Sequence, residues 1–390
     1  MPEAHGRAAP GFERLREVFR ETLAVPGKGG AALSVYRDGD EVVHLWGGER
    51  DRGLPWRVDT LVCGFSTGKG VTALAIQILV DRGLLNLDAP VCETWPEFAA
   101  HGKEGITTRM LLNHTAGLPT FPDYERVVST DRPASFQDHG SITAGLASAE
   151  PLWEPGTQSG YHSLTMGFLL GEIVLRLTGS TIGQFTRREI VGPLDLDYWV
   201  GLPSSEHHRV ARLSADPVFG DDATFAAMNP SSLGGRAFFL GKERRLDAVF
   251  EQTFNDPGFR LAEVAAAGPH TDARSLARMY GALAQGGDLD GVTLVSPTAI
   301  RDFAQQSFEG TDCIAGIHSR LGLGYALNSP LRYAMGPNPD TFGHPGYGGA
   351  TAFADPQAGI GFGFVSNALI SAPGTDPRVL DLVDAVYECV

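Results

Sequence analysis

The chain of 390 residues is long enough for two or three domains, each with its own core. Its 43% hydrophobic and 20% charged residues are typical of a soluble globular protein. The formal net charge is −15, and Lys and Arg never form a run of five or more, so nucleic acid and anionic membranes are poor candidate partners.

The cysteines and the apolar runs exclude further classes of protein. Cys63, Cys92, Cys313 and Cys389 have neither C-x-x-C nor metal-ligand spacing, so we expect no disulfide framework and no metal site. The first residues contain no uninterrupted apolar segment typical of a signal peptide, and the near-apolar run 73–80 is too short to cross a bilayer. We therefore expect a cytoplasmic protein without a membrane segment.

The first elements are predicted to be a helix, a β-hairpin and a second helix. Apolar residues recur at helical spacing over 12–23, and Pro26 ends this helix. Residues 31–36 and 41–48 are rich in β-formers and flank an Asp-Gly turn. A strong helical pattern follows over 66–82. This order does not fit the βαβ alternation of a parallel sheet.

The middle of the chain is predicted to be mostly helical and its end to return to strands. Helical stripes lie around 169–177 and 276–283, whereas 215–260 indicates no firm structure. Strand-like runs at 322–327, 350–354 and 360–365 precede a closing helix over 379–386. The predicted fold class is α/β, with an antiparallel sheet flanked by helices. Residues 1–70 and 315–390 would form the sheet domain, and 71–314 an inserted, mostly helical domain with an irregular loop at 215–260.

The most informative short motif is Ser66-Thr67-Gly68-Lys69, which follows a short β-like run at the start of a helix. The i, i+3 spacing places the amine of Lys69 beside the hydroxyl of Ser66. A serine becomes a nucleophile when a base takes its proton, and lysine can do so if burial or positive charge lowers its pKa. The same four residues also fit an N-cap serine followed by a solvated lysine.

Ser66 also lies within Gly64-Phe65-Ser66-Thr67-Gly68, which fits the G-x-S-x-G elbow of α/β-hydrolases. Asp340 and His344 would then complete a triad in the right chain order. Three observations argue against this alternative. A hairpin precedes the serine, no His-Gly-Gly-Gly segment lies upstream, and Asp340 and His344 are only four residues apart.

Four further segments, in order along nearly the whole chain, distinguish these alternatives. They are Leu111-Leu112-Asn113-His114-Thr115-Ala116-Gly117-Leu118-Pro119, the Pro155-Gly156-Thr157 loop before Tyr161, Gly192-Pro193-Leu194, and Gly343-His344-Pro345-Gly346 followed by Gly348-Gly349. Together with S-x-x-K they make the chain resemble the serine β-lactamase and penicillin-binding-protein superfamily. More narrowly, it resembles the class C branch, which includes family VIII carboxylesterases and related amidases and transacylases.

The resemblance implies a role for each matching residue. Ser66 would be the acyl-forming nucleophile and Lys69 its general base or proton relay. Tyr161 matches the tyrosine of the family's Y-x-N motif and would share a proton with both, or protonate the leaving group. The backbone N–H groups of Ser66 and Tyr347 would form the oxyanion hole.

The sequence departs from the family pattern at two motifs. Ser163 replaces the asparagine of Y-x-N. His344 and Pro345 replace the lysine and threonine of K-T-G, while Gly346 keeps its glycine. Less positive charge and one fewer hydroxyl should weaken binding of a β-lactam carboxylate. The pattern therefore favours an esterase-like or peptidase-like member.

Several residues near these motifs have competing interpretations. We expect His114 to hydrogen-bond a turn between helices, whereas His162 either lines the pocket or faces solvent. Trp153, Phe121 and Tyr124 either form an apolar acyl pocket or belong to the core.

The sequence as a whole predicts a serine hydrolase that cleaves small-molecule carboxylic esters through an acyl-enzyme on Ser66, with no cofactor and no metal. A transacylase, peptide cyclase or amidase acting on an amide or ester would use the same acyl-enzyme and remains an alternative. A weak β-lactamase and a non-catalytic binding module are the remaining alternatives. The oligomeric state is left open.

Overall fold

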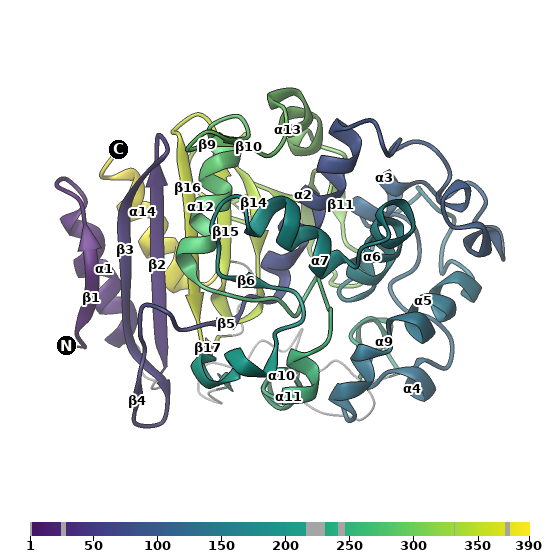
Figure 1. The fold of residues 1–390 in the computed structure, drawn as a ribbon, viewed down its shortest axis with the longest axis horizontal. Helices are drawn as coiled ribbons and strands as arrows, with labels where there is room; N and C mark the ends of the chain where they lie inside the picture. Colours follow the sequence, from purple (N-terminus) through teal and green to yellow (C-terminus); the bar gives the residue numbers. More distant parts are fainter. Residues whose placement is uncertain (1, 25–28, 216–230, 241–245, 331, 371–374) are drawn as a thin grey trace.

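The computed structural model describes residues 2–24, 29–215, 231–240, 246–330, 332–370 and 375–390. A broad antiparallel sheet lies on one side of the molecule and a mostly helical region on the other (Figure 1). Both chain termini lie on the sheet side. The predicted fold class is thereby confirmed, while the domain boundaries stay a prediction.

The main sheet is built from both ends of the chain. Its central pairing joins Ala31–Ser366 through Arg37–Ile360, so the N-terminal hairpin continues directly into the C-terminal strands. All its pairings are antiparallel. In spatial order the strands are β1 (Ala4–Ala8), β3 (Asp40–Asp51), β2 (Gly30–Arg37), β16 (Ile360–Ser366), β15 (Thr351–Asp355), β14 (Phe342–Pro345), β13 (Ala326–Leu327), β12 (His318–Leu321) and β11 (Phe308–Thr311), with β4 (Leu54–Pro55) beside β3.

The alternating residues of β16 give the sheet two different faces. Phe362 and Phe364 pack into a core beneath the helices α1 (Glu13–Ala24) and α14 (Pro377–Tyr387). Gly361 and Gly363 point to the opposite face, where a Cβ atom would lie 2.2 Å and 2.3 Å from backbone atoms of α12 (Ala273–Ala284). Because both positions lack a side chain, α12 packs directly on the sheet.

The helical region carries the larger core, into which α2 (Gly68–Asp81) is almost wholly buried. Around it lie α3 (Thr108–Leu112), α4 (Tyr124–Val127), α5 (His139–Ser148), α6 (Thr165–Thr178), α7 (Ile182–Thr186), α9 (Leu233–Ala237), α10 (Leu246–Phe254), α11 (Pro257–Arg260) and α13 (Pro297–Ala304). In the part of the chain that the structure describes, three small sheets accompany them. One has three strands, β5 (Val62–Cys63), β8 (His270–Thr271) and β6 (Tyr198–Trp199), and the other two are pairs, β9 (Asp288–Leu289) with β10 (Val292–Thr293) and β7 (Ser214–Ala215) with β17 (Ala368–Leu369). No helix among the described residues has the length and apolar character needed to span a bilayer.

The predicted terminal helices and the hairpin are confirmed, but two segments differ from expectation. The chain begins with β1, whose short, polar and mostly exposed sequence lacks the alternation that marks a strand; it forms by pairing along β3. Gly6 is required there, because a Cβ atom would lie 2.1 Å from the His44 carbonyl oxygen. The described part of 215–260, expected to be irregular, contains α9, α10 and α11, since its phenylalanines pack into the core.

Candidate active site

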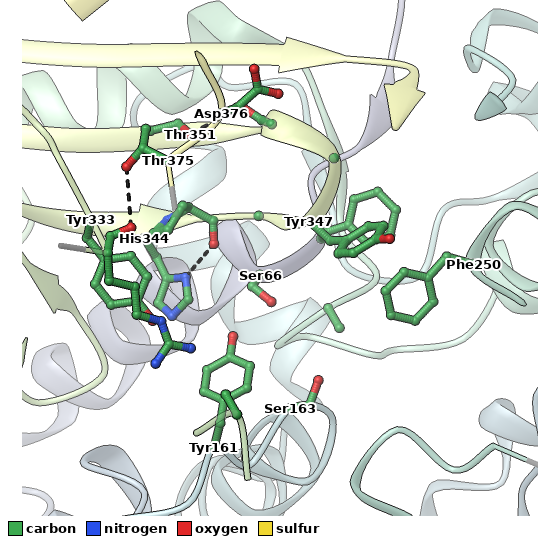
Figure 2. Close-up of a pocket in the computed structure, with 18 of the residues that line it drawn as sticks. Ser66, Tyr161, Ser163, Phe250, Tyr333, His344, Tyr347, Thr351, Thr375 and Asp376 are labelled. Atoms are coloured by element: carbon green, nitrogen blue, oxygen red, sulfur yellow. Dashed lines mark hydrogen bonds between the residues drawn. The ribbon is translucent and has the colours of Figure 1, made fainter. Parts of the chain in front are cut away.

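Ser66 lies at a sharp turn between a strand and a buried helix. The chain leaves β5, forms the short 3₁₀ helix η1 (Phe65–Thr67) and enters α2. Phe65 adopts a positive φ of 47°, which is uncommon for a large side chain and indicates a backbone held by its surroundings. A Cβ atom on Gly68 would lie 2.2 Å from the Ala265 carbonyl oxygen, so only glycine fits at this approach. The turn leaves Ser66 partly exposed and facing a cavity (Figure 2).

Lys69 is fully buried one helical turn beyond Ser66. Its Nζ donates to the carbonyl oxygens of Ser163 at 2.7 Å and Ala266 at 3.0 Å, and lies 3.4 Å from Ser66 Oγ. Burial holds the pKa of this amine well below its ordinary value. The predicted contact between Lys69 and Ser66 is therefore present, in an environment that favours the neutral amine.

Tyr161 meets this pair from the loop before α6. Its phenol points to Ser66 (Figure 2). The two hydroxyl groups share a hydrogen bond. Its ring centroid lies 4.5 Å from Lys69 Nζ. Burial raises the phenol pKa, so the group is a neutral proton donor at ordinary pH, while the bond to Ser66 acts in the opposite direction.

Two buried histidines fix the loop that carries Tyr161. His162 Nε2 accepts the backbone N–H of Leu118 at 2.9 Å, while its Nδ1 lies 2.7 Å from the Gly160 carbonyl oxygen. His114 Nδ1 accepts the backbone N–H of His162 at 3.2 Å. Burial lowers the pKa of His162 to about 4, so it is neutral and bonded on both sides. His114 therefore bonds a turn as expected, and His162 neither lines the pocket nor faces solvent.

The C-terminal end of β14 lies against the other side of the turn that carries Ser66. A Cβ atom on Gly346 would lie 2.5 Å from the Gly64 carbonyl oxygen, so the strand end and η1 touch through their backbones. The chain then forms η8 (Tyr347–Gly349). The Tyr347 ring packs at 4.8 Å from Phe250 and 5.9 Å from Phe65, measured between ring centroids.

His344 brings no positive charge to the site. Its Nδ1 lies 2.7 Å from the Pro345 carbonyl oxygen, and its ring stacks on Tyr161 at 6.2 Å between centroids. Burial is the main cause that lowers the pKa of His344 to about 3. Asp340, the acid of the α/β-hydrolase alternative, is exposed, and the fold is not that of an α/β-hydrolase. That alternative is wrong.

The cavity holds about 1090 Å³ of space, including open solvent at its mouth. Ser66, Tyr161, Ser163, His344, Gly346 and Tyr347 all line it, with Lys69 buried behind Ser66. Phe121 and Tyr124 do not line it; they are buried against Phe239 in the core. The phenylalanines that line it are Phe65, Phe238, Phe250 and Phe254. Among the residues that the structure describes, no group of three His, Cys, Asp or Glu side chains is placed to hold a metal ion.

The chain is similar to known proteins along most of its length. A family model described as Beta-lactamase matches residues 15–385. The chain belongs to the beta-lactamase family. Esterase/beta-lactamase LipL of Mycobacterium tuberculosis is 33% identical, over 94% of this chain and 83% of the relative. Esterase EstB of Burkholderia gladioli is 34% identical over 51% of this chain and 53% of its own length.

Solved structures of similar proteins match this chain along its entire length. A penicillin-binding protein homologue from Caulobacter crescentus is 38% identical with a TM-score of 0.88, and covers 100% of both chains. A family VIII carboxylesterase is 35% identical with a TM-score of 0.87, again over 100% of both chains. The resemblance inferred from the motifs is thus confirmed.

Part of the cavity lining of this beta-lactamase family member does not follow from the sequence motifs. Phe250 and Phe254 lie one helical turn apart on α10, and their i, i+4 spacing was a signal that this segment is helical. Arg332 and Tyr333 also line the cavity, but they belong to no motif and lie in a loop before β14. No local pattern indicates such residues, because only the fold brings them to Ser66.

Proposed function

We propose that this protein is a serine hydrolase that cleaves small-molecule carboxylic esters through an acyl-enzyme on Ser66. The observation that carries the proposal is the surroundings of the Lys69 amine. Two of its N–H groups donate hydrogen bonds to carbonyl oxygens, and the remaining position on the nitrogen faces Ser66 Oγ. A neutral amine held in this way directs its lone pair at the serine hydroxyl, as a general base must.

The proposed reaction has two halves. Lys69 takes the proton of Ser66 as Oγ bonds to the ester carbonyl carbon, and the backbone N–H groups of Ser66 and Tyr347 stabilise the oxyanion. The bond from carbon to the alcohol oxygen then breaks, and that oxygen receives a proton from the Tyr161 phenol, which Lys69 reprotonates. In the second half, Lys69 takes a proton from the water that attacks the acyl carbon. The bond from that carbon to Ser66 Oγ then breaks, Lys69 returns the proton to Oγ, and the carboxylic acid leaves.

The relatives support an ester as the scissile group. LipL and EstB are both named as esterases, and a structural neighbour of 35% identity is a carboxylesterase. Two substitutions in the K-T-G motif support esters over β-lactams as substrates. His344 is neutral and lacks the charge of the lysine that it replaces, and Pro345 lacks the hydroxyl of the threonine that it replaces.

Hydrolysis of p-nitrophenyl butyrate by wild type, Ser66→Ala and Ser148→Ala tests the proposal. Ser148 is an exposed serine on α5, so its variant controls for the substitution itself. We expect Ser66→Ala to lose about 10⁴-fold or more in kcat, since nucleophile and base act as a unit, and Ser148→Ala to match wild type. Mass spectrometry after reaction with a fluorophosphonate should locate the label on Ser66. An unlabelled Ser66 together with an inactive wild type would overturn the proposal.

A further inference from the structure

The turn that carries the Tyr347 N–H group has an irregular backbone. It joins β14 to β15, and Gly348 and Gly349 within it adopt positive φ angles of 75° and 100°. The Gly346 N–H donates to the Ala350 carbonyl oxygen at 2.5 Å, which closes the turn. A turn with two left-handed glycines has no regular ladder of hydrogen bonds to fix its peptide groups, so contacts from outside set their orientation.

A buried ion pair at the start of α14 lies directly against this turn. Arg378 Nη2 donates to Asp376 Oδ2 at 2.7 Å, and the two side chains are 8% and 4% exposed. Asp376 Oδ1 also accepts the backbone N–H of Arg378 at 2.8 Å. A Cβ atom on Gly349 would lie 2.3 Å from Asp376 Oδ2 and 2.8 Å from Arg378 Nη2. The backbone of the turn therefore packs on the pair with no side chain between them.

Arg378 links the turn to the neighbouring strands. Its Nη2 donates to the carbonyl oxygens of Gly348 at 3.0 Å and Ala368 at 3.1 Å. Its Nη1 donates to Ser366 Oγ at 3.1 Å. Ser366 ends β16 and Ala368 begins β17. One planar guanidinium thus holds the turn, both strands and Asp376 in a fixed relation, a task that suits its rigid fork of donors.

Stability alone gives no reason for a buried charge pair at this place. Withdrawing two charges from water costs about as much as their attraction returns, and well-packed apolar residues often replace such pairs without loss. Neither charge is available to a substrate. Asp376 lines the cavity, but both of its oxygens accept from Arg378, and its carboxylate points away from Ser66 (Figure 2). Arg378 does not line the cavity.

We infer that Arg378, held in place by Asp376, is a positioning residue that orients the Tyr347 N–H group toward the oxyanion. The inference rests on the proposed function, in which this N–H group and that of Ser66 stabilise the oxyanion. Arg378 acts through the Gly348 carbonyl group, one residue beyond Tyr347 in the turn. Because the oxyanion forms only as Oγ bonds to the ester carbonyl carbon, loss of this anchor should slow the chemical step and leave substrate binding nearly unchanged.

The double variant Asp376→Asn/Arg378→Met tests the inference without leaving a buried charge unpaired. Asn keeps the shape of Asp376 and its capacity to cap α14, and Met keeps an unbranched apolar stem at position 378. We expect kcat for p-nitrophenyl butyrate to fall by about 10- to 100-fold, with KM within about threefold of wild type. Urea unfolding of the same sample shows that the variant is folded in the assay.

Arg378→Lys is a second variant, which keeps both charges and so protects the test if the double variant does not fold. A single ammonium group cannot bond Asp376 and the three other acceptors at once, so we expect kcat to fall by about 3- to 10-fold. Wild-type kcat in whichever of these variants unfolds cooperatively would overturn the inference. A raised KM at unchanged kcat would assign the pair to substrate binding and also overturn it.

Asp197→Asn/Arg209→Met is the matched control. Asp197 and Arg209 form an ion pair whose side chains are 30% and 14% exposed, and neither lines the cavity. The control removes the same two charges and should keep wild-type kcat and KM. An equal loss of kcat in the control and in Asp376→Asn/Arg378→Met would show a general effect of removing an ion pair and would overturn the inference.

Inhibition by butane-1-boronic acid is a readout that a merely structural role would not move. Ser66 Oγ bonds to boron, its proton passes to Lys69 and no group leaves, so that one boron-bound oxygen occupies the position of the oxyanion. We expect the inhibition constant of Asp376→Asn/Arg378→Met to rise by about 10- to 100-fold, in step with the loss of kcat. An unchanged inhibition constant would overturn the inference while Ser66-dependent hydrolysis still stands. A wild type that neither hydrolyses the ester nor binds the boronic acid through Ser66 would refute the proposed function, and the inference with it.

Discussion

Gly346→Ala tests whether the contact between β14 and the Ser66 turn sets the geometry of the oxyanion hole. The added Cβ atom would lie 2.5 Å from the Gly64 carbonyl oxygen and 3.2 Å from the Cβ atoms of Phe65 and Ala350. Because a Cβ atom essentially never lies within 3.0 Å of such a neighbour, strand and turn must separate by about 0.5 Å. The atom in the way is backbone, so no side-chain rotation can relieve the overlap.

The expected loss follows from hydrogen-bond geometry. The N–H groups of Ser66 and Tyr347 belong to the two segments that are pushed apart. A donor that lies about 3 Å from the oxyanion would move to about 3.5 Å, at the limit of a useful hydrogen bond. Losing one such donor typically lowers kcat by about 10²- to 10³-fold. The accompanying loss of stability should be about 1–3 kcal/mol, as for other cases of overpacking.

The assay is kcat for p-nitrophenyl butyrate together with the free energy of unfolding in urea, so that lost activity is separated from unfolding. Gly140→Ala is the control, because a Cβ atom at this position of α5 has no neighbour within 4 Å. We expect it to keep wild-type activity and stability. A folded Gly346→Ala variant with wild-type kcat would refute the reasoning that this backbone contact positions the oxyanion hole.

Three further predictions concern titratable groups. Tyr161→Phe should lower kcat by about 10²- to 10⁴-fold with little change in melting temperature, because the ring remains and the phenol is lost; unchanged kcat would remove its proposed proton transfer. The buried Lys69 has a lowered pKa, so the unfolded chain binds a proton that the folded chain does not. The free energy of unfolding of wild type relative to Lys69→Met should therefore rise with pH toward 10.5, by up to about 1.4 kcal/mol per pH unit. Urea unfolding of both proteins at pH 7 and pH 9 measures this difference. The same difference at both pH values would contradict a lowered pKa of Lys69. For His162 and His344 the pKa falls from 6.5 to about 4 and about 3, so wild type should lose stability as the pH drops below 6.5. Each histidine contributes up to about 1.4 kcal/mol per pH unit, and equal unfolding free energies at pH 7 and 5 would contradict neutral buried rings.

The sequence by itself determined the elements that depend on local spacing. Helical periodicity located α1, α2, α6, α12 and α14, and runs of β-forming residues located β2, β3, β13, β15 and β16. The S-x-x-K spacing predicted that Ser66 and Lys69 touch, because i and i+3 share a helix face whatever the surroundings. The family motifs likewise pointed to Tyr161, His344 and Tyr347.

Only the tertiary structure decided the character of the cavity. The strand β1 was not predicted, because it forms by backbone pairing with β3 and its side chains show no strand pattern. Arg332 and Phe250 reach the cavity from segments far from Ser66 in the chain, so no local pattern places them at the active site. The neutral state of His344 and the lowered pKa of Lys69 also arise from burial. Spacing along a helix or strand is fixed by backbone geometry, whereas burial and charge at a site are fixed by which distant segments pack around it.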